Sequence, residues 1–182
     1  MEQTGGERIL ERYNGRKLGW LHDSLFFLLL LAAAFILFRF GIGLSVVGGE
    51  SMEPALHSGE LVVYLRPVQK YRIGDIVSVR VPSGEYYVKR VAAVGGDTVD
   101  LRDGTVYVND VPLEEDWSAA ETLPESGAVI YPYTVRAGNV FVLGDNRGAS
   151  MDSRAFGEVN VRQIKGRLIL RAGPWYVRRI GS

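Results

Sequence analysis

Three segments of the chain hold polar residues whose types could cleave a peptide bond, and the first centres on Ser51. This serine lies in the run Gly48–Leu56, in which glycines let the backbone approach a ligand closely. A serine hydroxyl is a poor nucleophile unless a neighbouring base accepts its proton. The sequence contains no cysteine and only two histidines, so a thiol nucleophile is excluded and the choice of base is narrow.

Common serine-hydrolase patterns do not fit Ser51. Glu53 stands where the Gly-x-Ser-x-Gly pattern needs its second glycine, and Pro54 stands where Ser-x-x-Lys needs its lysine. His57 lies too close in sequence to be oriented freely against the serine. The base must therefore come from elsewhere in the chain, and a Ser-Lys pair is an accepted variant of the catalytic triad.

Lys89 has the surroundings that such a base needs. It lies in the apolar, strand-like run Tyr86–Val91, where alternation places it on the same face as Tyr87. Burial disfavours the charged ammonium form and lowers the pKa of a lysine, which would allow Lys89 to accept a proton near neutral pH. The alternative interpretation is a lysine that snorkels from a half-buried strand or protects a sheet edge.

The third segment is Phe141–Arg154, which turns polar after its first apolar residues. Asp145, Ser150, Asp152 and Arg154 could form a buried network in which an Asp–Arg pair fixes the loop and a hydroxyl holds a lysine amine. The alternative is a solvated loop. These residue types do not indicate a metal site, and no cofactor is expected.

The chain carries a segment suited to a membrane. Residues 25–38 contain no polar side chain, and apolar character resumes after Arg39 as far as Leu44. A spanning helix needs roughly 20 apolar residues, so residues 25–44 are predicted to form a transmembrane helix with Arg39 near one end. A buried core helix and a cleaved signal peptide are the alternatives, and the second lacks a clean small-x-small cleavage site.

Basic residues before this helix predict its orientation, because lysine and arginine favour the cytoplasmic side. Residues 1–24 are therefore expected to be a cytoplasmic segment. Residues 45–182 would then be an extracytoplasmic domain of a single-pass protein of the cell membrane. The formal net charge of zero argues against nucleic acid as a partner. The basic residues are Arg8, Arg12, Arg16 and Lys17.

Short β-branched runs punctuated by glycine follow the membrane segment and predict a mainly β domain, a barrel or a sandwich. Turn residues at 82–84 and 103–104 predict two hairpins. The acidic stretch near 112–134 is expected to be a surface loop or a small cap. The predicted strands are Glu60–Tyr64, Asp75–Val81, Glu85–Val91, Thr98–Leu101, Thr105–Val108, Val140–Leu143 and Gly166–Leu170.

Taken in order, the polar segments resemble the motifs of bacterial type I signal peptidases, from the membrane segment to about Gly166. Residues 51–54 match the family's Ser-Met-x-Pro, and residues 89–90 match its Lys-Arg pair. Residues 144–147 match Gly-Asp-Asn-Arg, and residues 150–154 match Ser-x-Asp-Ser-Arg. The resemblance implies a signal-peptidase-like β catalytic domain preceded by one N-terminal transmembrane helix.

The resemblance also implies roles for individual residues. Ser51 would attack the scissile carbonyl, and Lys89 would accept and return the proton. Ser150 would orient the lysine. Gly49 stands where some members carry a serine that assists the oxyanion hole, so stabilisation would rest more on backbone amides such as that of Ser51. The residues implied to hold the site together are Asp145, Asp152 and Arg154.

In this family the substrate lies as an extended strand beside the segment before the serine and the strand leading to the lysine. Shallow apolar pockets there would select small residues, as in the Ala-x-Ala sites of signal peptides on exported preproteins. The lipid bilayer and the secretion translocon are the other partners implied. The candidate pocket residues are Val47, Met52, Leu56, Tyr87 and Val88.

Two other interpretations stay open. Bacterial repressors that cleave themselves show a similar Gly-x-Ser-Met serine and a lysine at a similar distance, but here an apolar segment precedes the β region where they carry a DNA-binding helix-turn-helix. Alternatively, the chain could be a catalytically silent extracytoplasmic β domain that binds exported proteins. Replacing Ser51 or Lys89 by alanine would separate an enzyme from a silent domain.

Overall fold

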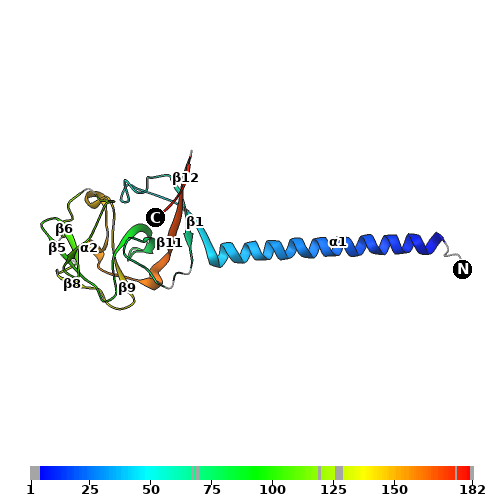
Figure 1. Ribbon diagram of the computed structural model, residues 1–182, viewed down its shortest axis with the longest axis horizontal. Coiled ribbons are helices and arrows are strands. Elements are labelled where there is room, and N and C mark those ends of the chain that lie inside the picture. Colours follow the sequence, from blue (N-terminus) through cyan, green and yellow to red (C-terminus); the bar gives the residue numbers. More distant parts are fainter. Residues whose placement is uncertain are drawn as a thin grey trace. The chain divides into compact units, whose positions relative to one another are not determined.

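The protein is described here by a computed structural model that covers residues 5–66, 68, 70–118, 120–125, 129–174 and 176–180 (Figure 1). The chain divides into two compact units, Met1–Gly41 and Ile42–Ser182. The first contains helix α1, Gly5–Ile36, which continues into a π-helical turn, η1, at Leu37–Gly41. Residues His22–Gly41 are long and apolar enough to cross a membrane, and none of that stretch is buried.

The predicted transmembrane helix is wrong at its C-terminal end, since residues 42–44 belong to strand β1, Ile42–Val46. Composition could not reveal this boundary, because the apolar character continues across it. Pairing decides it instead, with β1 lying antiparallel to β2, Leu61–Leu65. Gly43 permits this pairing because a Cβ there would lie 2.2 Å from the ring of Tyr64.

The second unit is mainly β, as predicted, and its larger sheet is antiparallel throughout. The strand order is β1-β2-β11-β3-β4-β9-β10, with β12 paired to β11. The seven predicted strands are all present. Thr105–Val108 has the predicted bounds, the other six have shifted ends, and the largest shifts extend β4 to Val94 and β11 at both ends. The remaining strands of this sheet are β3 Ile76–Arg80, β4 Tyr86–Val94, β9 Asn139–Leu143, β10 Val159–Asn160, β11 Ile164–Gly173 and β12 Tyr176–Arg179.

A smaller antiparallel sheet has the order β7-β6-β5-β8 and gathers on the side of the β domain away from β12 (Figure 1). The hairpin between β5 and β6 turns at Asp103 and Gly104, both with positive φ, as the Asp-Gly signal predicts. The predicted surface excursion joins β7 to β8, and residues 119 and 126–128 within it lie outside the described residues. The strands are β5 Thr98–Arg102, β6 Thr105–Val108, β7 Val111–Pro112 and β8 Tyr133–Thr134.

Three short helices complete the described part of the domain, and two of them lie between β9 and β10. These are the 3-10 helix η2, Arg147–Ala149, and helix α2, Ser153–Phe156; the third is the 3-10 helix η3, Val161–Gln163. Successive side chains of β4 alternate between the two faces of the sheet and therefore pack in different hydrophobic clusters. Tyr87 and Val91 pack among the valines of β3 and β9, whereas Val88 packs with Met52 and Leu168.

Candidate active site

The fold brings Ser51 and Lys89 together, 38 positions apart in sequence. The Nζ atom of Lys89 lies 2.7 Å from the Oγ atom of Ser51. Ser51 lies in the turns that connect β1 to β2, and Lys89 lies on β4, paired across the sheet with Val77. A hydrogen bond of this length is what a nucleophilic hydroxyl and its general base require. The sequence suggested Ser51 as the nucleophile and Lys89 as its base, but it could not give the distance between them.

Burial gives Lys89 the character of a base. Only 2% of its surface is exposed, and its amine lies 5.4 Å from the centre of the Tyr87 ring. Desolvation lowers the pKa of Lys89 from its ordinary 10.5 to about 8, while the carboxylates of Asp152 and Asp145 oppose that shift. An appreciable fraction of the amine is therefore neutral close to physiological pH.

The turn that carries Ser51 is fixed by the loop after β9. The backbone N–H of Asn146 donates to the Ser51 carbonyl at 3.1 Å, and its side-chain amide donates to the carbonyl of Glu50 at 3.2 Å. Gly49, two residues before the serine, has a φ of 83°. That conformation favours glycine over the serine found in some family members.

Gly144 makes this contact possible, because there is no space beside its Cα. A Cβ at this position would lie 2.0 Å from Oγ of Ser150 and 2.6 Å from the carbonyl oxygen of Ser51. Ser150 is buried, and its hydroxyl has no hydrogen-bond partner in the described part of the chain. The hydrogen bond to Lys89 that the resemblance implies is thus not formed in this structure, although the hydroxyl lies in the same loop.

Asp152 and Arg154 form a buried pair within this loop, where the sequence predicted an Asp–Arg network. Asp152 is fully buried and accepts from the backbone N–H of Gly144 at 3.0 Å. The Arg154 guanidinium donates to both carboxylate oxygens, at 2.9 and 3.0 Å, and to the carbonyl of Arg147 at 2.8 Å. The pair therefore ties both ends of the loop together.

Asp145 pairs with Arg90, a partner that the sequence did not suggest. Two hydrogen bonds, of 2.8 and 2.6 Å, join the guanidinium to the carboxylate, and the guanidinium also lies 4.5 Å from the ring of Trp117. Burial raises the pKa of Asp145, and Arg90 opposes that shift. Because Arg90 follows Lys89 on β4, this pair anchors the loop directly to the strand that carries the base.

Arg147 is a second residue that sequence reasoning missed. Its side chain is buried and donates to the Gly144 carbonyl at 2.9 Å, to both carboxylate oxygens of Glu115 and to the hydroxyl of Thr122. Glu115 and Thr122 belong to the segment predicted to be a surface excursion. This segment therefore contributes buried polar contacts to the loop behind the catalytic candidates.

A groove of about 460 Å³ opens beside Ser51 and Lys89. Four of the five predicted pocket residues line it, namely Val47, Met52, Tyr87 and Val88. The prediction for Leu56 is wrong. Its side chain is completely buried in the core beside Met52, where the backbone N–H of Leu56 donates to the Met52 carbonyl. An apolar residue near a nucleophile can face the core as readily as the groove.

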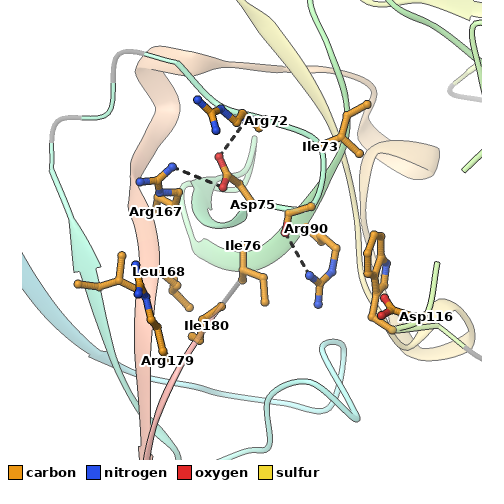
Figure 2. Close-up of a pocket in the computed structure, with 13 residues that line it drawn as sticks. Arg72, Ile73, Asp75, Ile76, Arg90, Asp116, Arg167, Leu168, Arg179 and Ile180 are labelled. Atoms are coloured by element: carbon orange, nitrogen blue, oxygen red, sulfur yellow. Dashed lines mark hydrogen bonds and ion pairs between the residues drawn. The ribbon is translucent and has the colours of Figure 1, made fainter. Parts of the chain in front are cut away.

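A second pocket, of about 560 Å³, lies near the start of β3 and contains neither Ser51 nor Lys89 (Figure 2). Asp75 accepts from the backbone N–H of Arg72 and pairs with Arg167 at 3.6 Å. Arg90 reaches the same pocket while bound to Asp145. Three of the six charged residues that line this pocket, Asp75, Arg90 and Arg167, therefore have ion-pair partners in the described chain.

The described residues contain no group of three or more His, Asp or Glu side chains that could hold a metal ion.

Comparison with known proteins identifies the family. Residues 19–173 match the family model described as signal peptidase, peptidase S26. The chain belongs to this family. The family consists of signal peptidases, so the chain is a serine endopeptidase that removes signal peptides from exported preproteins, and the sequence-based expectation of this family is confirmed.

Two individual relatives and one solved structure are each similar to more than half of this chain. Signal peptidase I of Bacillus licheniformis is 38% identical over 133 residues, which cover 66% of this chain and 71% of that protein. Thylakoidal processing peptidase 1 of Arabidopsis thaliana is 34% identical, over 68% of this chain and 40% of that protein. A crystal structure of a signal peptidase I from Enterococcus faecalis is 34% identical and covers 56% of this chain and 99% of that chain, with a TM-score of 0.46.

Proposed function

We propose that this signal peptidase uses Ser51 as its nucleophile and Lys89 as its general base. The observation that carries the proposal is the 2.7 Å separation of Lys89 Nζ and Ser51 Oγ, with the amine buried and its pKa lowered to about 8. A neutral amine at that distance can accept the serine proton as the hydroxyl oxygen attacks the scissile carbonyl.

The same pair suffices for both halves of the reaction. After the attack, the protonated amine of Lys89 returns its proton to the nitrogen of the leaving peptide, and an acyl-Ser51 intermediate remains. The amine then takes a proton from water as the water oxygen attacks the ester carbonyl, and it returns that proton to the Ser51 oxygen as the ester bond breaks, which releases the carboxylic acid product. The backbone N–H of Ser51 is the candidate donor to the oxyanion, since Gly49 has no side chain to contribute.

Replacement of the two residues tests this assignment. Ser51→Ala and Lys89→Met should each lower cleavage of a detergent-solubilised preprotein by at least about a thousandfold, because each removes a group on which the other depends. Circular dichroism and thermal unfolding report whether each variant is folded. A folded variant that retains near-normal turnover would contradict the dyad.

We further propose that the substrate lies as a strand in the groove and presents small residues, as in Ala-x-Ala sites. β1 pairs only with β2, and residues 86–89 of β4 pair only with β3, so in the described chain two sheet edges that line the groove lack a strand partner. An extended peptide could hydrogen-bond to such edges. Val47, Met52 and Val88 give the wall an apolar surface.

Residues 25–41 would anchor the enzyme in the bilayer with its N-terminus in the cytoplasm and its β domain outside. The support is the apolar stretch His22–Gly41 and the basic residues before it. Anchoring confines the enzyme and a membrane-bound preprotein to one plane and raises their effective concentration. The secretion translocon is a candidate partner on the same reasoning.

The absence of cysteine allows a direct test of this topology. Gln3→Cys and Thr105→Cys each introduce a single thiol, one before the apolar segment and one on the β domain. In intact cells a membrane-impermeant maleimide should label Thr105→Cys and spare Gln3→Cys. The opposite labelling pattern would overturn the orientation and leave the catalytic assignment untouched.

A further inference from the structure

One charged group that lines the catalytic groove has no role in the dyad. Glu85 lines the groove, is exposed, and lies immediately before β4. Its Oε2 atom accepts from the hydroxyls of Ser83 at 3.1 Å and Tyr87 at 3.2 Å. None of the ion pairs found in the described chain involves Glu85.

Glu85 is the only acidic residue that lines the groove within the described chain. Apart from the buried Lys89, the other lining residues are uncharged. The carboxylate also acts on its surroundings, because it raises the pKa of the Tyr87 phenol. An approaching peptide therefore meets one fixed negative charge in this groove, and no basic side chain is paired with it.

The position of this charge along a bound peptide follows from strand geometry. Glu85, Tyr87 and Lys89 alternate onto one face, and four residues of strand span about 13 Å. An extended substrate has the same rise of about 3.3 Å per residue, so about four of its residues cover the same length. With its scissile carbonyl at Ser51, the substrate residue beside Glu85 is separated from the cleaved bond by about four positions.

The side of the cleaved bond follows from the proposed binding mode, on which this inference rests. The groove is lined by residues 45–48 and 85–89 together with Ser51, and the small residues of an Ala-x-Ala site lie on the amino-terminal side of the cleaved bond. The peptide in the groove is therefore the end of the signal peptide, and Glu85 faces the residue about four before the cut.

We propose that Glu85 is a specificity determinant that favours signal peptides with a lysine or arginine about four residues before the cleaved bond and disfavours those with an acidic residue there. The attraction acts between exposed groups, so its size is modest. A lysine peptide should exceed an otherwise identical glutamate peptide in kcat/KM by roughly two- to tenfold, since one pairing is attractive and the other repulsive.

Three peptides with one common cleavage site test this proposal, with Lys, Gln or Glu at the fourth residue before the cut. Companion sets carry the change at the fifth and sixth residues, outside the Ala-x-Ala site. The full chain in detergent should cleave them in the order Lys, Gln, Glu at low salt. The spread should shrink in about 0.5 M salt, because the Debye length falls to a few ångströms.

Variants assign the preference to Glu85. Glu85→Gln should bring the Lys-to-Glu ratio close to one, and Glu85→Lys should invert it. Glu114→Gln is the matched control, because Glu114 is also exposed but lies outside the groove, and it should keep the wild-type ratio. An unchanged ratio in Glu85→Gln would overturn the proposal, as would equal cleavage of all nine peptides by the wild type.

The outcomes separate this inference from the function on which it rests. Cleavage of the Gln peptides without any charge preference would reject the role of Glu85 and leave the peptidase assignment standing. Failure of the wild type to cut any peptide, with a known signal peptidase active on the same set, would reject both. The wild-type ratio and its salt dependence decide the matter even if a Glu85 variant folds poorly.

Discussion

Replacing Lys89 with methionine should raise the stability of the β domain at neutral pH and abolish one component of its pH dependence. Methionine keeps most of the length and volume of the lysine but carries no charge. The wild type has to bury an amine whose pKa is lowered from 10.5 to about 8 in the folded chain. Below about pH 8 the folded chain therefore bears the full cost of burying a charged amine, and between about pH 8 and 10.5 the unfolded chain binds more of this proton than the folded chain.

The size of the effect follows from the two pKa values. At roughly 1.4 kcal/mol for each pKa unit, the mismatch costs the wild type about 3 kcal/mol near pH 7. Near pH 9.5 the folded amine is already neutral, whereas the unfolded amine is still mostly protonated, and the cost falls to about 1.5 kcal/mol. The destabilisation caused by Lys89 therefore decreases as the pH rises through this interval, so the free energy of unfolding increases, and the change levels off above about pH 10.5.

Chemical denaturation of the wild type and Lys89→Met at the two pH values measures this contribution. The stability advantage of the variant should shrink by about 2 kcal/mol as the pH rises from about 7 to about 9.5. Other titrating groups contribute equally to the two proteins and cancel when the variant is compared with the wild type. The pH-independent effect of replacing lysine by methionine cancels when the two pH values are compared. An advantage that stays constant across the interval would show that Lys89 keeps an ordinary pKa.

Two further substitutions test the loop behind the dyad. Gly144→Ala should lower kcat by roughly a hundredfold or more and destabilise the domain by about 1–3 kcal/mol, because its Cβ would collide with the Ser51 carbonyl. Gly148→Ala is the matched control with open space around its Cα, and turnover assays should show it close to wild type. Asp145→Asn should cost about 3–5 kcal/mol in denaturant unfolding, because it leaves the Arg90 guanidinium, whose side chain is only 11% exposed, without its carboxylate. Asp100→Asn, which affects an exposed pair, should cost less than about 1 kcal/mol, and equal costs would refute the importance of burial.

The sequence predicts the strands well where residue alternation and turn chemistry agree, as at the β5–β6 hairpin. It fails at β1, because Ile42–Leu44 are as apolar as the helix before them and only pairing with β2 distinguishes the two. It also fails at Leu56, whose type predicts burial but not whether the burial is in a groove or in the core.

The partners of the candidate site show a similar division. The apolar run around Lys89 marked it as a candidate base, but a lysine that snorkels from the strand fits the same run, and the ordered motifs were needed to favour the base. The pairing of Arg147 with Glu115 spans 32 positions, and no local pattern connects an acidic stretch to a loop that far away. No partner was predicted for Arg90 either, because Asp145 reaches it through the pairing of β4 with β9.

The pH dependence of kcat/KM tests the Ser51–Lys89 assignment most directly, because it reports the ionisation of the free enzyme's base. With a soluble peptide whose own groups do not titrate between about pH 6 and 10, the rate should rise about tenfold per pH unit below 8 and level off above it. Lys89→Arg should be inactive throughout, because a guanidinium keeps its proton. A profile that is flat across this range, or a Lys89→Arg variant that retains the wild-type rise, would contradict lysine as the general base.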